Sequence, residues 1–144
     1  MSSTKAPWHH WPVAVIALVF YALVAVDYTL STLGVAAYLS LGPDGAAVMF
    51  STLAPWLTGI WAVGVWGGLA GAWLLWKRNR WSVLLLLAAA LALIFMTIWL
   101  SLFARPTVFG AIGFLGFYVL LGSSAIALLI YMYARWERSA RMLI

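Results

Sequence analysis

The sequence contains no cysteine and very little charge. Without cysteine the chain forms no disulfide, no thiolate metal site, no iron–sulfur cluster and no thiol nucleophile. Charged residues make up 8% of the 144 residues, whereas a soluble domain contains about 25%. Hydrophobic residues make up 67%. A water-exposed surface cannot be built from this composition, which therefore predicts an integral membrane protein.

The few basic residues are spread along the chain. Eight Lys and Arg residues stand against three Asp and Glu residues, which gives a net charge of +5. The basic residues fall at the ends of apolar runs rather than in one patch, and this pattern argues against a nucleic-acid-binding surface. Their positions instead indicate how the chain is oriented in a membrane.

Four apolar runs are long enough to cross a bilayer. Crossing about 30 Å of hydrocarbon takes about 20 mostly apolar residues as a helix, and a backbone in lipid must satisfy its own hydrogen bonds. The first run is longer than the core of a signal peptide, which spans about 7–15 residues, so we expect a retained helix. The predicted transmembrane helices are 12–34, 55–76, 82–103 and 110–133, with a short periplasmic interfacial helix at 46–53.

Lys and Arg residues near the helix ends indicate the orientation, because cytoplasmic loops carry an excess of them. Seven of the eight fall on one side, and only Arg105 falls on the other. The tight connection at 77–81 makes the second and third helices antiparallel neighbours. We therefore predict a single all-α transmembrane domain, an up-down-up-down four-helix bundle with both termini in the cytoplasm. The seven residues are Lys5, Lys77, Arg78, Arg80, Arg135, Arg138 and Arg141.

The second predicted helix carries glycines at four-residue spacing. They form the motifs Gly64-x-x-x-Gly68 and Gly67-x-x-x-Gly71. Small residues at this spacing let helix backbones approach closely in a membrane. We expect these four glycines to pack against neighbouring helices of the bundle; contact with another chain is the alternative.

Asp27 is an ionisable residue inside the first predicted helix. Such a residue is costly in a membrane and is a functional hypothesis by default. Counting inward from the outer ends of the other helices places Trp61, Thr97 and Tyr118 at the same depth, and the stem of Arg105 is long enough to reach toward the carboxyl group. The sequence therefore predicts a polar cluster in the outer half of the bundle, formed by Asp27, Trp61, Thr97 and Tyr118 and capped by Arg105.

The sequence offers little catalytic or metal chemistry. His9 and His10 are adjacent and the chain has only two histidines, so we predict no metal or haem site and expect both rings to be interfacial and solvated. No Ser or Thr has an intramembrane His or Lys to activate it, and no second membrane carboxylate pairs with Asp27. A glycine-rich phosphate loop is also missing. We therefore expect a protein that is not an enzyme and carries no cofactor.

Four segments of the chain resemble a known group of proteins. They are Trp8-His9-His10-Trp11, Asp27-Tyr28, Trp61-Ala62-Val63-Gly64-Val65-Trp66-Gly67-Gly68 and Lys77-Arg78. This pattern, over roughly the first two thirds of the chain, resembles small uncharacterised four-helix inner-membrane proteins of Gram-negative bacteria that are often loosely labelled "sugar transporter". The resemblance implies a bacterial inner-membrane protein in which Asp27 matters. The spans contain no row of Asn, Gln and acidic groups suited to sugar hydroxyls.

Three functions are compatible with the sequence, and the third of them is a ligand or lipid sensor. The first is an accessory subunit that packs against a larger membrane complex, such as a respiratory or photosynthetic assembly, through its aromatic and glycine-rich faces. The second is a small oligomeric transporter or permeation protein that uses Asp27 as a proton, cation or ligand site. Asp27 could also only fix the register of the helices. The expected partners are the lipid bilayer and other membrane subunits or further copies of this chain.

Overall fold

A computed structural model describes residues 5–42 and 45–144, and over these ranges every regular element is a helix. Four helices of 23, 22, 21 and 27 residues are long and apolar enough to cross a membrane, which confirms the four predicted spans. They are α1 (His10–Thr32), α4 (Pro55–Trp76), α5 (Ser82–Leu102) and α7 (Gly113–Ser139).

Two helix boundaries are set by glycines with positive φ. Gly34 has φ +65° and follows α1 directly after its C-cap, a position where glycine avoids the clash of a Cβ atom. Gly113 has φ +78° and divides the predicted fourth helix into a short α6 (Val108–Ala111) and the long α7. α7 then continues beyond its predicted end, and its last turns bury Glu137.

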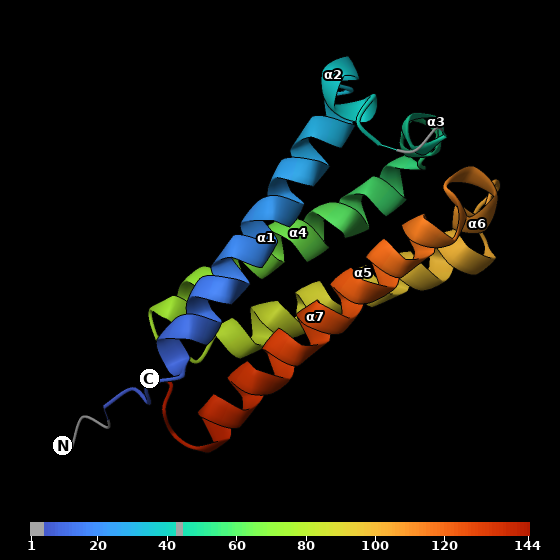
Figure 1. Cartoon of the computed structure of the whole chain (residues 1–144). Helices are drawn as coiled ribbons and strands as arrows, with labels where there is room; N and C mark the ends of the chain where they lie inside the picture. The colour runs from blue at the N-terminus through green and yellow to red at the C-terminus, as the bar shows by residue number, and fades with distance from the viewer. Residues whose placement is uncertain (1–4, 43–44) are drawn as a thin grey trace.

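Three short helices lie at one end of the bundle, called here the loop end (Figure 1). They are α2 (Ala36–Leu39), α3 (Ala46–Ser51) and α6. α3 stands where the sequence predicts an interfacial helix over 46–53, and it contacts both α1 and α6. The short helices therefore cover one end of the long ones.

The opposite end, called here the basic end, joins the start of α1, the α4–α5 turn and the end of the chain (Figure 1). The Ile144 amide donates a hydrogen bond to the Arg78 carbonyl at 2.7 Å, and the Arg80 amide donates to the Ile144 carbonyl at 3.0 Å. The Arg78 guanidinium also donates to the Met142 carbonyl at 2.7 and 3.1 Å. These bonds fasten the C-terminal residues to the turn.

α4 contacts α1 on one side and α5 on the other, and α5 contacts α7. Glycine makes the first of these approaches possible, because a Cβ atom at Gly68 would lie 1.9 Å from the ring of Tyr21. A Cβ atom added at Gly64 would lie 3.2 Å from a side chain of α5, and one added at Gly71 would lie 2.9 Å from another. A Cβ atom added at Gly67 would meet no described atom within 4 Å. Gly64, Gly68 and Gly71 thus lie at helix contacts, whereas Gly67 faces away from the bundle.

Candidate functional site

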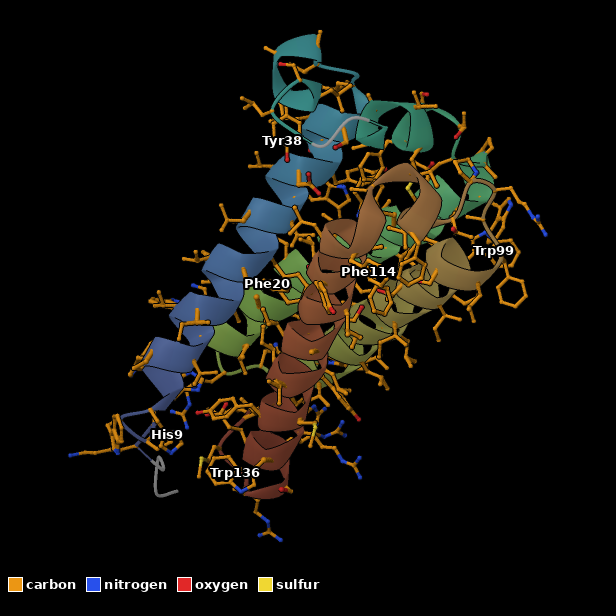
Figure 2. The ribbon with its side chains drawn as sticks, turned by 45° about the vertical axis from the view of Figure 1, so that its right-hand side comes forward. His9, Phe20, Tyr38, Trp99, Phe114 and Trp136 are labelled. Atoms are coloured by element: carbon orange, nitrogen blue, oxygen red, sulfur yellow. The ribbon has the colours of Figure 1, made fainter. Side chains whose placement is uncertain are left out.

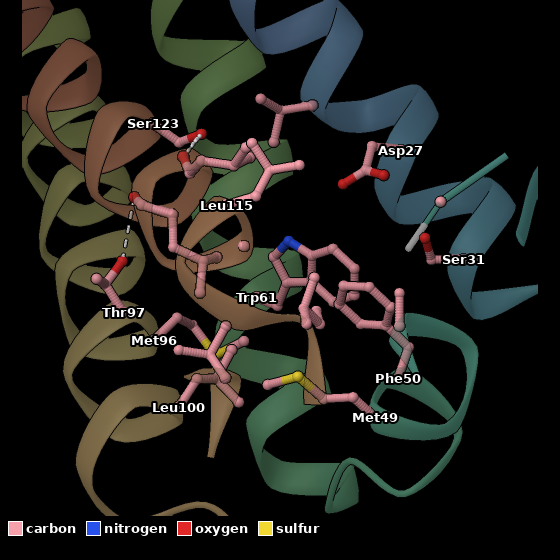
Figure 3. A pocket seen from close by; sticks show the side chains of 18 of the residues that line it. Asp27, Ser31, Met49, Phe50, Trp61, Met96, Thr97, Leu100, Leu115 and Ser123 are labelled. Atoms are coloured by element: carbon pink, nitrogen blue, oxygen red, sulfur yellow. Dashed lines mark hydrogen bonds between the residues drawn. The ribbon is translucent and has the colours of Figure 1, made fainter. Parts of the chain in front are cut away.

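A cavity of about 350 Å³ lies at the loop end, between α1 and α7 (Figure 3). All seven helices contribute side chains to its wall. Much of the wall is apolar, with Met49, Met96, Leu100 and Val108 among its residues. Small-molecule pockets in proteins measure about 300–1,000 Å³. This pocket therefore has the size and the apolar lining of a site for a small ligand.

Asp27 is the one charged residue in the described wall of this pocket. Its side chain is half-buried, and the Tyr38 hydroxyl of α2 donates a hydrogen bond to its Oδ1 atom. The chain turns at Gly34, and this turn places α2 in contact with α1. The pKa of Tyr38 is raised to about 12, mainly by burial and to a lesser extent by the hydrogen bond to Asp27 and the charge of that carboxylate. The Tyr38 hydroxyl therefore remains a donor at neutral pH.

Trp61 of α4 lies beside Asp27 in the pocket and is only 7% exposed. Its ring stacks on Phe50 of α3 with 5.2 Å between ring centroids, and Tyr28 of α1 meets its ring edge-on at 4.9 Å. Figure 3 shows the Asp27 carboxylate turned toward the Trp61 ring. The two neighbouring aromatic rings thus hold Trp61 in place next to the carboxylate.

The wall opposite Asp27 carries hydroxyl groups, which include Thr97 and Ser123 (Figure 3). The hydroxyl oxygens of Thr97 and Ser124 of α7 lie 2.7 Å apart, and they lie 3.0 and 3.1 Å from the Leu93 carbonyl oxygen. Each hydroxyl has one proton, so one of the two donates to the other, which donates to the carbonyl. Ser123 donates to the Val119 carbonyl at 2.8 Å. The Thr97 and Ser124 hydroxyls join α5 to α7, and all three hydroxyls already have hydrogen-bond partners. Asp27, with Tyr38 and Ser31 near it, is therefore the main polar feature available to a ligand.

The structure brings together three of the five residues of the predicted cluster. Asp27, Trp61 and Thr97 all line the pocket. Tyr118 is 63% exposed and lies outside the lining, because the rotation of α7 turns Gly116 and the two serines inward instead. Arg105 is exposed and also lies outside the pocket, because α5 ends at Leu102 and the helical spacing behind the prediction stops there. Tyr38 takes the place beside the carboxylate for which the sequence suggested Arg105.

A second polar site lies at the basic end and was not predicted from the sequence. His10 and Glu137 are 1% and 0% exposed, and Nδ1 of the ring lies 2.7 and 3.0 Å from the two carboxylate oxygens. His9 shares a 2.6 Å hydrogen bond with the Tyr133 hydroxyl. The expectation of two solvated histidines is therefore wrong for His10. Figure 2 shows His9 and Trp136 together at this end, far from Tyr38.

A sequence signal for this second site does exist. The distribution of basic residues puts the start of the first helix and the end of the fourth on the same side. Glu137 is the one acidic residue on that side, and the two histidines are the only ones in the chain. Packing then buries the pair where α1 meets α7. The Nε2 atom of His10 is buried with no hydrogen-bond partner in the part of the chain that the structure describes.

No protein-family model, curated protein or solved structure matches this chain. The described residues contain no group of three or more His, Asp or Glu side chains that could hold a metal ion. The pocket can hold a molecule with an apolar body and one group that pairs with the Asp27 carboxylate.

Proposed function

We propose that this chain is a multi-pass membrane protein that binds a small, mostly apolar molecule in the pocket and carries it across the membrane. The observation that supports this most directly is a pocket of about 350 Å³ whose described wall has a single charged residue, Asp27. Ionisable residues inside membrane spans typically mark substrate or proton pathways. A residue that only fixed the helix register would pack against protein, whereas Asp27 borders a cavity.

We propose that the basic end lies in the cytoplasm and the loop end in the periplasm, with the four long helices in up-down-up-down order. The concentration of Lys and Arg at one end supports this orientation. The resemblance to small four-helix proteins of Gram-negative bacteria supports an inner-membrane location. Four helices enclose little space, so we propose that a complete pathway needs at least two copies of the chain.

The arrangement of the two polar sites agrees with transport. The pocket lies at the loop end, whereas the buried pair of His10 and Glu137 joins α1 to α7 at the basic end. A carrier that exposes its site to one side needs such a closure on the other side. We propose that this state takes up the ligand from the periplasmic side.

Thiol labelling tests the orientation and the pocket together, because the chain has no cysteine and gives no background. We would introduce Ser123→Cys in the pocket, Ser40→Cys on the exposed loop end and Ser139→Cys on the exposed basic end. A membrane-impermeant thiol reagent is then added to spheroplasts. We expect labelling of the Ser123→Cys and Ser40→Cys variants, and labelling of the Ser139→Cys variant only after permeabilisation.

The same variants serve to find a ligand. A molecule that occupies the pocket slows the labelling of Ser123→Cys and leaves Ser40→Cys unchanged. Uptake of that molecule into proteoliposomes should then be lost in Asp27→Asn. The proposal is wrong if Ser123→Cys stays unreactive while Ser40→Cys reacts, or if a protecting molecule is never taken up. External labelling of Ser139→Cys would reverse the orientation.

An accessory subunit of a larger membrane complex is the second candidate, and the outer face of α4 favours it. Cβ atoms added at Gly59 and Gly67 would meet no described atom within 4 Å. Trp56, Trp66 and Trp73 on the same helix are 48%, 49% and 54% exposed. Small residues beside half-exposed aromatic ones on one helix suit close contact with another membrane helix.

Purification at native abundance distinguishes the two candidates. Recovery of a large partner in a fixed ratio would support the function as an accessory subunit. This partner should be lost in Gly67→Leu and kept in Gly122→Leu. Gly122 is a matched control, because it also has open space around it but lies on α7. Recovery of the chain alone or as a homo-oligomer would contradict the subunit function.

A further inference from the structure

The charge in the pocket indicates the sign of the ligand. Asp27 is the single charged side chain in the described wall, and none of the lining residues is Lys, Arg or His. A carboxylate in apolar surroundings is costly unless it is paired. Tyr38 supplies one hydrogen bond, whereas a carboxylate has about four acceptor positions. The remaining positions are satisfied best by a positive group on the ligand.

The aromatic surface next to the carboxylate suits the same sign of charge. Trp61 lines the pocket, and Phe50 stacks on it with a centroid distance of 5.2 Å. A cation within about 6 Å of an indole face is attracted by the negative charge of the ring face. Asp27 and Trp61 come from different helices and are brought side by side only by packing (Figure 3). A cation paired with Asp27 would therefore lie beside the Trp61 ring.

The rest of the wall defines the body of the ligand. Met49, Met96 and Leu100 offer apolar, adaptable surface, and the hydroxyls of Thr97 and Ser124 are bonded to each other and to a backbone carbonyl. A sugar would leave most of its hydroxyls without partners here, at a considerable cost for each. The body of the ligand is therefore apolar.

We propose that the pocket binds lipophilic cations, held by the Asp27 carboxylate beside Trp61, with their apolar bodies against the methionine and leucine side chains. This inference rests on the proposed function, since it names the class of molecule that the pocket takes. It predicts that, of two molecules with the same shape and opposite charges, the protein binds the positive one more tightly.

Tetraphenylphosphonium and tetraphenylborate provide that comparison, because they have nearly the same size and shape and opposite charges. Binding of each ion to the full chain in non-ionic detergent is measured by equilibrium dialysis against protein-free micelles. The net charge of +5 attracts the anion to the protein as a whole. A preference for the cation must therefore come from a local negative group. We expect the cation to bind at least about tenfold more tightly than the anion.

Variants assign the preference to the pocket. Asp27→Asn keeps the shape of the side chain but removes its charge, so this variant should bind the two ions about equally. Asp27→Glu should keep most of the preference for the cation. Thr32→Ala, an exposed position on the same helix, serves as the control and should bind like the wild type. Gel filtration and helical circular dichroism verify that each variant is folded. The comparison of the two ions on the wild type needs no variant.

The possible results separate this inference from the proposed function. Equal binding of both ions, or an unchanged preference in Asp27→Asn, overturns the cation assignment and leaves a pocket for amphiphiles of either charge. Binding of the anion alone also overturns it. If neither ion binds, the cation assignment is wrong, and the Ser123→Cys labelling decides independently whether the pocket is accessible to any ligand.

Discussion

The buried pair of His10 and Glu137 should be a major source of stability at the basic end. The two side chains are 1% and 0% exposed and are joined by contacts of 2.7 and 3.0 Å. Glu137→Leu leaves the His10 ring buried with neither nitrogen bonded, because its Nε2 atom has no partner among the described residues in the wild type either. Breaking a buried pair in this way costs about 3–5 kcal/mol in soluble proteins.

The membrane reduces the expected cost. Measured hydrogen bonds between helices in a membrane average about 0.6 kcal/mol, because the unfolded state in the membrane also finds partners. The pair of His10 and Glu137 is fully buried and includes a carboxylate, so it should exceed that average. We predict that Glu137→Leu lowers the free energy of unfolding by about 2–3 kcal/mol.

A double-mutant cycle separates the pair from general effects of the substitutions. His10→Leu combined with Glu137→Leu removes both polar groups, so the double variant should lose less than the sum of the two single variants, by about 1–2 kcal/mol. Unfolding is followed in mixed micelles with increasing fractions of SDS, using circular dichroism. Arg138→Gln, at an exposed neighbouring position, is the control and should change stability by less than about 0.5 kcal/mol. Additive single effects, or a Glu137→Leu variant as stable as the wild type, would refute the reasoning.

Three other predictions concern single residues. Gly68→Ala should lower the free energy of unfolding by about 1–3 kcal/mol, because the new methyl group would lie 1.9 Å from an aromatic ring of α1; Gly67→Ala, with open space around it, should be neutral or stabilising in the same SDS titration. Thr97→Val keeps the shape but loses the 2.7 Å bond to α7, so it should cost about 0.5–1.5 kcal/mol, and an unchanged midpoint would contradict this. The raised pKa of Tyr38 favours its neutral form in the folded protein, so its contribution to stability is complete below pH 10 and is lost as the pH rises toward about 12. Carbon-13 NMR of labelled tyrosine should show one ring titrating near that value, absent in Tyr38→Phe and shifted downward in Asp27→Asn; a wild-type midpoint near 10 would contradict the contact.

The length and spacing of apolar runs determined the spans, because a helix in lipid satisfies its own backbone and needs only enough apolar residues. The four spans and the short helix after the first loop were accordingly predictable from local sequence. Depth was also predictable by counting residues from the helix ends, since the rise of a helix per residue is constant. That count placed Asp27, Trp61 and Thr97 at one level, and all three line one pocket.

Rotation and close packing were decided only by the tertiary structure. Tyr118 lies at the predicted position along α7 but faces outward, because depth does not specify which face of a helix meets its neighbours. The partner of Asp27 is Tyr38, which reaches it because the chain turns at Gly34 after α1. The pairing of His10 with Glu137 joins residues 127 positions apart. Apolar length is a property of each segment alone, whereas these contacts depend on how several segments pack together.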